Sequence, residues 1–217
     1  MISISKLILV TGATSMVCLL LLHFLSPEFD PSWRMISEYA LGKHKGFLTA
    51  FFFLSGLCTM MLPFLLWNET TSLWPKIGLV LVFLSGVGSL MGGLFDIKHP
   101  LHGSAFALGI PTIAIGALLV TYHLLRRSDW AQYSTGTLVS AHSIWISIVL
   151  MGVSMAVMMS GFKQAGVPMG PGATPPDAVP EGVIAVAGYF NRLVVVCYTA
   201  WIMLMAYVDL MLRDSAS

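Results

Sequence analysis

The chain has 217 residues, of which 57% are hydrophobic and only 10% are charged, and its formal net charge is +1. A soluble domain usually carries about 25% charged residues, whereas a protein in a bilayer needs apolar residues on its outer faces as well as inside. The composition therefore excludes an ordinary soluble domain and predicts an all-α, polytopic transmembrane helix bundle. The near-neutral charge gives no reason to expect nucleic acid as a partner.

Six stretches are apolar over about the 20 residues that a membrane-spanning helix needs. They cover residues 7–26, 47–67, 74–95, 101–125, 137–161 and 183–211. The three connections between the second and the fifth stretch are short, so neighbouring helices are expected to form antiparallel hairpins. The whole chain, residues 1–217, is expected to be a single transmembrane domain.

The first connection, residues 27–46, is longer than the connections in the middle of the chain. Asp30 is a residue type that caps helices, and Pro31 suits a first helical turn. Apolar side chains then recur at helical spacing, at Trp33, Ile36 and Ala40. The segment is therefore predicted to form a short helix that lies in the membrane interface.

The fifth connection, residues 162–182, is rich in proline and glycine and is predicted to be an irregular, solvated loop. With six spans, the first, third and fifth connections lie on one membrane face and both termini on the other. Lysine and arginine are divided evenly between these faces, so the positive-inside rule does not set the orientation. The Arg126-Arg127 pair beside a span end favours cytoplasmic termini.

Most of the chemically interesting polar residues lie in or beside the first, third and fifth connections. Six spans would bring these residues to one end of the bundle, where they could line a polar pocket. The candidate ligand-binding residues are Ser37, Glu38, Asp96, His102, Asn191 and Arg192.

The third connection carries three side chains that could hold a zinc ion together, namely Asp96, His99 and His102. His102 is expected at the N-terminus of the fourth span, where the helix dipole disfavours an imidazolium and so keeps the ring available as a ligand or a base. A polar turn in which Asp96 pairs with Lys98 or caps a helix explains the same residues. Both interpretations remain open.

Arg192 is predicted to lie about nine residues into the last span, roughly 13 Å along the helix at 1.5 Å per residue. A charge at such a depth is tolerated when it is paired, hydrated or able to reach the surface. We expect Arg192 to pair with Glu38 or Asp96 inside the bundle or to contact an anionic headgroup, with extension to the membrane surface as the alternative. Glu38 has a local alternative as well, an ion pair with Arg34 one helical turn earlier.

Four short motifs carry a family resemblance: MISEYALG at 35–42, FD at 95–96, HG at 102–103 and NRL at 191–193. Together they resemble the bacterial and archaeal six-helix membrane family called domain of unknown function nine-nine-eight, and the resemblance covers nearly the whole chain. In that family the last-span motif is more often Gln-Arg, and Phe-Pro usually precedes the aspartate, so this chain departs from both patterns. The resemblance implies an integral membrane protein, and it implies no reaction.

Three functional classes remain open. The first is a protein of uncharacterised activity whose polar pocket at one membrane face binds a lipid headgroup or a small amphipathic ligand, with membrane lipids as its partners. The second is a metal-dependent membrane hydrolase with Glu38 as the candidate catalytic acid/base. The third is an accessory subunit or a small transporter, partnered by a second copy or by another membrane protein. In each case we expect a multi-pass protein of a cell membrane, the prokaryotic inner membrane, with cytoplasmic termini.

Overall fold

The computed structural model describes residues 3–168 and 176–216, and these residues form helices and loops without a β-strand. Within these described residues, six long α-helices and three short 3₁₀ helices follow one another. In order they are α1 (Ile4–Leu25), η1 (Ile36–Leu41), α2 (Lys45–Leu66), η2 (Trp67–Glu69), α3 (Leu73–Leu94), α4 (His102–Leu124), η3 (Ala131–Tyr133), α5 (Ser134–Gln164) and α6 (Ala187–Ala216). All six α-helices are long and apolar enough to cross a membrane. The predicted helical bundle is therefore confirmed, and the chain is a multi-pass membrane protein.

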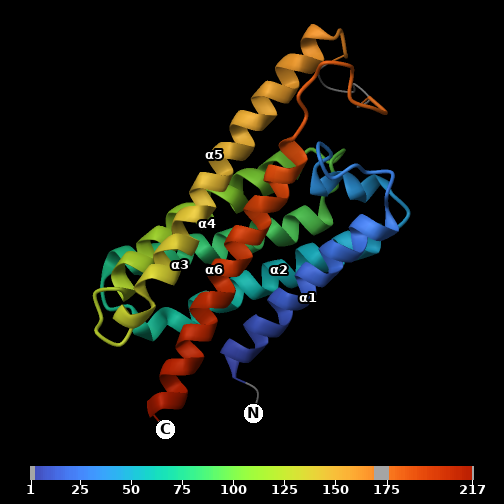
Figure 1. The fold of residues 1–217 in the computed structure, drawn as a ribbon. Helices are drawn as coiled ribbons and strands as arrows, with labels where there is room; N and C mark the ends of the chain where they lie inside the picture. The colour runs from blue at the N-terminus through green and yellow to red at the C-terminus, as the bar shows by residue number, and fades with distance from the viewer. Residues whose placement is uncertain (1–2, 169–175, 217) are drawn as a thin grey trace.

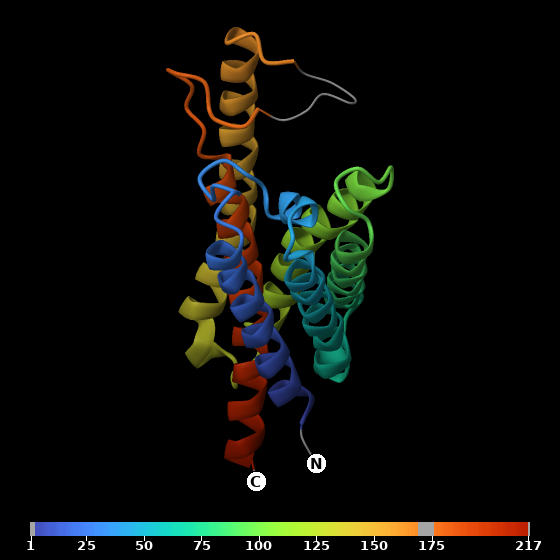
Figure 2. The same cartoon turned by 90° about the vertical axis from the view of Figure 1, so that its right-hand side faces the viewer.

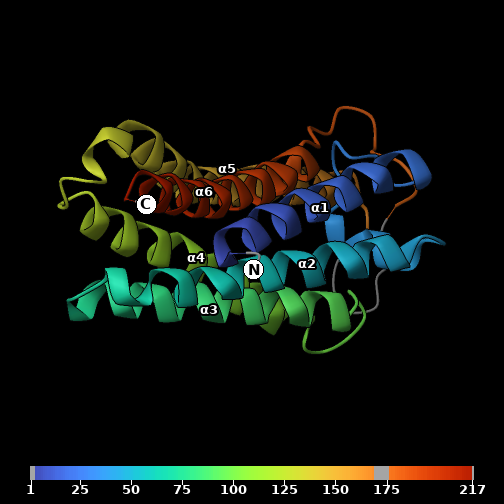
Figure 3. The same ribbon diagram turned by 90° about the horizontal axis from the view of Figure 1, so that it is seen from below.

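The helices pack as a series of antiparallel hairpins in two layers. Figure 1 shows both termini at one end of the bundle and the connection between α5 and α6 at the other. Seen from below, α1, α5 and α6 form one layer and α2, α3 and α4 the other (Figure 3), and α1 runs beside α6 in Figure 2 as well. In the apolar window of α6, 56% of the residues are buried, against 28% in α1 and in α5. The helix that carries Asn191 and Arg192 is therefore the most enclosed of the six.

Glycine lets the backbones of α3 and α4 touch. A Cβ atom added to Gly88 would lie 2.5 Å from the backbone nitrogen of Gly109, and one added to Gly116 would lie 2.7 Å from the carbonyl oxygen of Gly78. Lipid supplies no hydrophobic force between helices, so close backbone packing of this kind is a main source of their association. These contacts hold α3 and α4 together along their length.

The segment between α1 and α2 differs from the predicted interfacial helix. Its helix is a 3₁₀ helix that begins at Ile36, because the Asp30 carboxylate accepts a hydrogen bond from Ser32 N at 2.8 Å and holds a turn there instead. Trp33 and Ile36 are buried. The backbone of this segment rests directly on Gly188 of α6, where an added Cβ would lie 2.6 Å from Pro31 O. Tertiary contact with α6 therefore draws the segment into the bundle.

The connection between α5 and α6 covers residues 165–186, slightly later in the chain than the predicted 162–182, because α5 continues to Gln164 and α6 begins at Ala187. Its described parts, residues 165–168 and 176–186, contain no helix or strand. Residues 169–175, which hold part of the predicted proline-rich loop, lie outside the described residues. The later start of α6 places Arg192 in the second turn of that helix, about 8 Å from its first residue.

Candidate functional site

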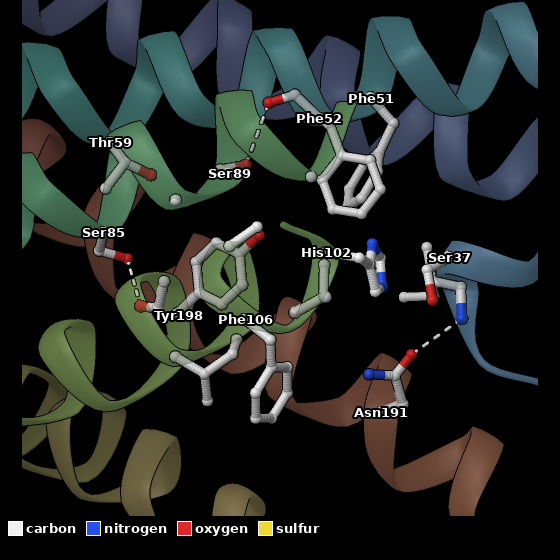
Figure 4. Close-up of a pocket in the computed structure, with 17 residues that line it drawn as sticks. Ser37, Phe51, Phe52, Thr59, Ser85, Ser89, His102, Phe106, Asn191 and Tyr198 are labelled. Carbon is white, nitrogen blue, oxygen red and sulfur yellow. Dashed lines mark hydrogen bonds between the residues drawn. The ribbon is translucent and has the colours of Figure 1, made fainter. Parts of the chain in front are cut away.

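A cavity of about 110 Å³ lies between η1, α2, α3, α4 and α6, near the end of the bundle opposite the termini. Figure 4 shows its walls, with the rings of Phe51 and Phe52 from α2 and the ring of Tyr198 from α6. The 17 lining residues are Ile36, Ser37, Phe51, Phe52, Thr59, Ser85, Gly88, Ser89, Gly92, His102, Ala105, Phe106, Gly109, Ile110, Asn191, Val195 and Tyr198. Three of the predicted site residues, Ser37, His102 and Asn191, are among them.

These three side chains form the polar end of the cavity. Asn191 Oδ1 accepts a hydrogen bond from Ile36 N at 2.9 Å, which fixes η1 against α6. Asn191 Nδ2 lies 3.5 Å from the sulfur of Met151, a weak acceptor. Figure 4 shows His102, Ser37 and Asn191 at the same end of the cavity. A hydroxyl, an imidazole and an amide from three separate elements therefore line the same end of the cavity.

The geometry around His102 decides which of its ring nitrogens can accept a hydrogen bond. His102 is the first residue of α4, and its Nδ1 lies 2.9 Å from the carbonyl oxygen of Phe95. A carbonyl oxygen only accepts, so Nδ1 must carry the proton. In the neutral ring Nε2 is then an acceptor. His102 consequently offers the cavity end a hydrogen-bond acceptor.

The far end of the cavity is apolar except for hydroxyl groups that have protein partners. Ser85 Oγ donates to Gly109 O at 2.7 Å, and the Tyr198 hydroxyl lies 2.9 Å from Ser55 Oγ. Asn191 and Tyr198 are seven residues apart on α6, so the cavity extends about 10 Å along that helix. The hydroxyl groups of Ser85 and Tyr198 in this half of the cavity are therefore engaged within the protein.

Glu38 is held by a local ion pair and is not among the cavity-lining residues. Arg34 Nη1 donates to Glu38 Oε2 at 2.8 Å, and Met35 N donates to Oε1 at 2.8 Å. The two charged side chains are 12% and 14% exposed. Arg34 Nη2 also donates to Pro176 O, which ties the first connection to the fifth. The local pair with Arg34 is thus the alternative that the structure supports for Glu38.

Arg192 contacts neutral groups, and this corrects the predicted pairing with Glu38 or Asp96. Its Nε donates to His23 Nε2 at 2.7 Å, and Nη1 donates to Arg34 O at 2.7 Å and Gly188 O at 3.0 Å. Nη2 donates to the Tyr39 hydroxyl at 3.1 Å. Among the described residues no carboxylate forms an ion pair with Arg192, because Arg34 already holds Glu38. Arg192 instead joins α1, the first connection and α6.

The predicted zinc site is not supported. Asp96 and His99 are exposed, and each accepts a backbone hydrogen bond within its own turn, Asp96 from Lys98 N at 2.9 Å and His99 from Leu101 N at 3.1 Å. The Nδ1 atom of His102 is bound to Phe95 O. The part of the chain that the structure describes holds no group of three His, Cys, Asp or Glu side chains placed to bind a metal ion. The polar turn, the other interpretation of these residues, accounts for all three.

Sequence reasoning did not identify the inner half of the cavity or the acceptor for Arg192. The residues concerned are Thr59, Ser85, Phe106, Tyr198 and His23. Hydroxyl residues inside apolar spans are common in helix packing, so their type alone does not mark a cavity. The one available signal is that Ser85 and Gly88 lie on one face of α3, where small side chains leave space.

A second polar cluster occupies the opposite end of the bundle and contains ion pairs. Asp209 of α6 is 4% exposed and accepts hydrogen bonds from Ser5 Oγ at 2.8 Å and from Arg213 Nε at 2.9 Å. Arg213 also lies 3.8 Å from Glu69, at the end of η2. Carboxylates and guanidinium groups from separate elements therefore neutralise one another around the termini.

Arg127 extends this cluster towards the connection between α4 and α5. It forms ion pairs with Glu69 and with Asp129, the latter through two hydrogen bonds at 2.7 and 3.1 Å. The hydrogen bonds from Arg127 lower the pKa of the Asp129 carboxyl below its usual range. The charge of Asp129 is thus favoured by the folded state.

The comparisons with known proteins give one match. A protein-family model described as "Protein of unknown function (DUF998)" matches residues 9–208. No curated protein and no solved structure matches the chain. The matched range includes every residue of the cavity.

Proposed function

Since the chain belongs to the DUF998 family of membrane proteins, whose function is unknown, we propose its function from the cavity: it binds a lipid or a small amphipathic molecule. The polar end of the ligand lies among Ser37, His102 and Asn191, and its apolar part lies against Phe52 and the inner wall. The observation that carries this proposal is one continuous, mostly apolar cavity with the polar side chains of Ser37, His102 and Asn191 at one end. An amphipathic molecule likewise joins a polar end to an apolar body.

The size of the cavity limits how much of the ligand it encloses. Pockets for drug-sized ligands measure about 300–1,000 Å³, whereas this one measures about 110 Å³. Phe106 lines the cavity and is also 50% exposed on the outer surface of α4. The cavity therefore borders the lipid-facing surface, and a ligand enclosed at its polar end extends past Phe106 into the bilayer.

Two alanines on α4 give a matched test. Ala105 lines the cavity and is 4% exposed, whereas Ala107, two residues later, is exposed. Ala105→Leu fills the space and should abolish retention of a lipid by the purified protein in native mass spectrometry, while Ala107→Leu should retain it like the parent. Equal retention by both variants would refute the proposal.

A second filling variant guards against a folding defect of the first. Val195 lines the same cavity from α6, so Val195→Phe should have the effect of Ala105→Leu through a different helix. The unfolding temperature of each variant in detergent is first measured against that of the parent. Lipid retention is then compared between the parent and a filling variant whose unfolding temperature is unchanged.

The orientation belongs to the proposal as well. We place the termini in the cytoplasm of a prokaryotic cell and the polar end of the cavity at the outer face of the inner membrane, because the Arg126-Arg127 pair follows α4 at the terminal end. A cysteine at Glu181 should react with an impermeant maleimide on whole cells, in a background without Cys18, Cys58 and Cys197. A cysteine at Ser215 should react only after lysis.

A further inference from the structure

The cavity has a hydrogen-bonding pattern without a charge. None of its 17 lining residues is Asp, Glu, Lys or Arg. Residues 169–175, outside the described part of the chain, have the sequence MGPGATP and contain no ionisable side chain. The cavity lining therefore offers an anionic headgroup no lysine or arginine side chain with which to pair.

The charges nearest in sequence to the cavity residues are engaged elsewhere. Glu38 is paired with Arg34. Arg192 uses four of its five N–H groups on His23, Arg34 O, Gly188 O and Tyr39. Burying a phosphate or carboxylate at a site of low dielectric without a paired cation is costly. An anionic ligand end is therefore disfavoured.

The three polar groups at the cavity end also require a particular partner. His102 Nε2 accepts a hydrogen bond, because Nδ1 is committed to Phe95 O. Asn191 Oδ1 already accepts from Ile36 N and one N–H of Nδ2 lies against the Met151 sulfur, so the amide can still donate its other N–H to the cavity. Ser37 Oγ can donate or accept. A group that donates to His102 and accepts from Asn191 or Ser37 matches all three, and a hydroxyl does both.

We propose that the cavity binds a lipid whose polar end is an uncharged hydroxyl, as in a diacylglycerol or a long-chain alcohol. The hydroxyl donates to His102 Nε2 and accepts from Asn191 Nδ2 or Ser37 Oγ, and the chains pass Phe106 into the bilayer. This inference rests on the proposed function and narrows its ligand to one chemical class. It also replaces the anionic headgroup considered for Arg192.

Dioleoylglycerol and dioleoyl phosphatidic acid test the inference, because they share their chains and differ in the charged phosphate. The parent protein, exchanged into detergent with equal amounts of both, should retain dioleoylglycerol at least about tenfold more than phosphatidic acid in native mass spectrometry. Preferential retention of phosphatidic acid would overturn the hydroxyl assignment and leave the lipid-binding proposal standing. Retention of neither lipid, with Ala105→Leu equal to the parent, would refute the proposed function itself.

Histidine variants locate the contact. His102→Asn retains a donor near Phe95 O but removes the acceptor at Nε2, so it should keep the fold and lower dioleoylglycerol retention about tenfold, the effect of one lost buried hydrogen bond. His99→Asn is the control, because His99 is exposed and does not line the cavity. Unchanged retention in His102→Asn would contradict the assignment.

The imidazole itself supplies a second readout. Nitrogen NMR of labelled His102 should show a protonated Nδ1 and an unprotonated Nε2, and dioleoylglycerol should shift the Nε2 resonance. A doubly protonated ring in the lipid-bound protein would overturn the inference, because such a ring has no acceptor for a hydroxyl proton.

Discussion

The two arginines of α6, one at each end of the bundle, are held in opposite ways, although the cavity end also contains the Arg34–Glu38 ion pair. At the terminal end Arg127 and Arg213 meet the carboxylates of Glu69, Asp129 and Asp209. At the cavity end Arg192 is bound by an imidazole, two carbonyl oxygens and a phenol. The first arrangement ties helix ends together through ion pairs. The second fixes the elements around the cavity and leaves the cavity lining uncharged.

The difference shows that a charge inside a bundle need not mark a binding site. Arg192 was the most conspicuous polar residue of the last span, yet it is not among the residues that line the cavity. Its role is to position η1 and α6, and Asn191 beside it reaches the cavity. The candidate binding groups are the neutral ones, because Ser37, His102 and Asn191 line the cavity.

Arg192→Leu should have the largest effect on stability. It removes four hydrogen bonds and leaves partly buried acceptors on His23, Arg34, Gly188 and Tyr39 without their donor. Hydrogen bonds to charged groups contribute about 1.5–3 kcal/mol each and are not additive, so we expect a loss of about 3–5 kcal/mol in unfolding experiments in detergent.

The partners of Arg192 can be checked by double-mutant cycles. His23→Leu combined with Arg192→Leu should show a coupling energy, whereas Glu38→Gln combined with Arg192→Leu should be additive. Strong coupling to Glu38 would restore the ion pair that the sequence suggested and would remove the contrast between the two ends.

Gly88→Ala should have the next largest effect. The added methyl group would lie 2.5 Å from the backbone nitrogen of Gly109, which cannot move away as a side-chain tip would. Overpacking of this kind costs about 1–3 kcal/mol. Gly152→Ala is the control, because nothing lies within 4 Å of its added Cβ. Thermal unfolding of both variants would measure the difference, and equal stability would mean that α3 and α4 are not in close backbone contact.

Asp209→Asn tests the terminal end. The variant keeps an oxygen for Ser5 but loses the charge that faces Arg213, whose side chain is 56% exposed. Solvent screens this pair, so the loss should be about 1 kcal/mol. Retention of dioleoylglycerol should be unchanged, since Asp209 lies at the end of the bundle away from the cavity. A loss of lipid retention would show that the two ends are coupled.

Asp129→Asn should have the smallest effect, and one that depends on pH. Because Arg127 lowers the pKa of Asp129 in the folded state, the carboxylate stabilises the fold above its unfolded pKa of about 3.9. That contribution is lost as the pH falls through the lower folded pKa. The side chain is 39% exposed, so solvent screening leaves only a few tenths of a kcal/mol. The stabilities of parent and variant should differ at pH 6 and converge towards pH 3, and a constant difference would contradict the ion pair.

The candidate site could be predicted in part. Ser37, His102 and Asn191 come from three distant parts of the chain, and the number of spans was enough to place them at one end. Asp96 and His99 lie at the same end but are exposed, because turn hydrogen bonds that spacing does not reveal fix their side chains. The partner of Arg192 was predicted incorrectly, since sequence gave no reason to prefer His23 over a carboxylate.

The sequence by itself determined the six helices and their alternating direction. Each span is specified locally, because about 20 apolar residues must satisfy their backbone hydrogen bonds within the segment to enter a bilayer. Only the tertiary structure decided the cavity, the acceptor role of His102 and the partners of Arg192. These features depend on the rotation and relative depth of the helices. Hydropathy fixes neither the rotation nor the depth of a helix whose lipid-facing and inner faces are both apolar. A hydrogen bond depends on both, because it requires atoms within about 3 Å of each other.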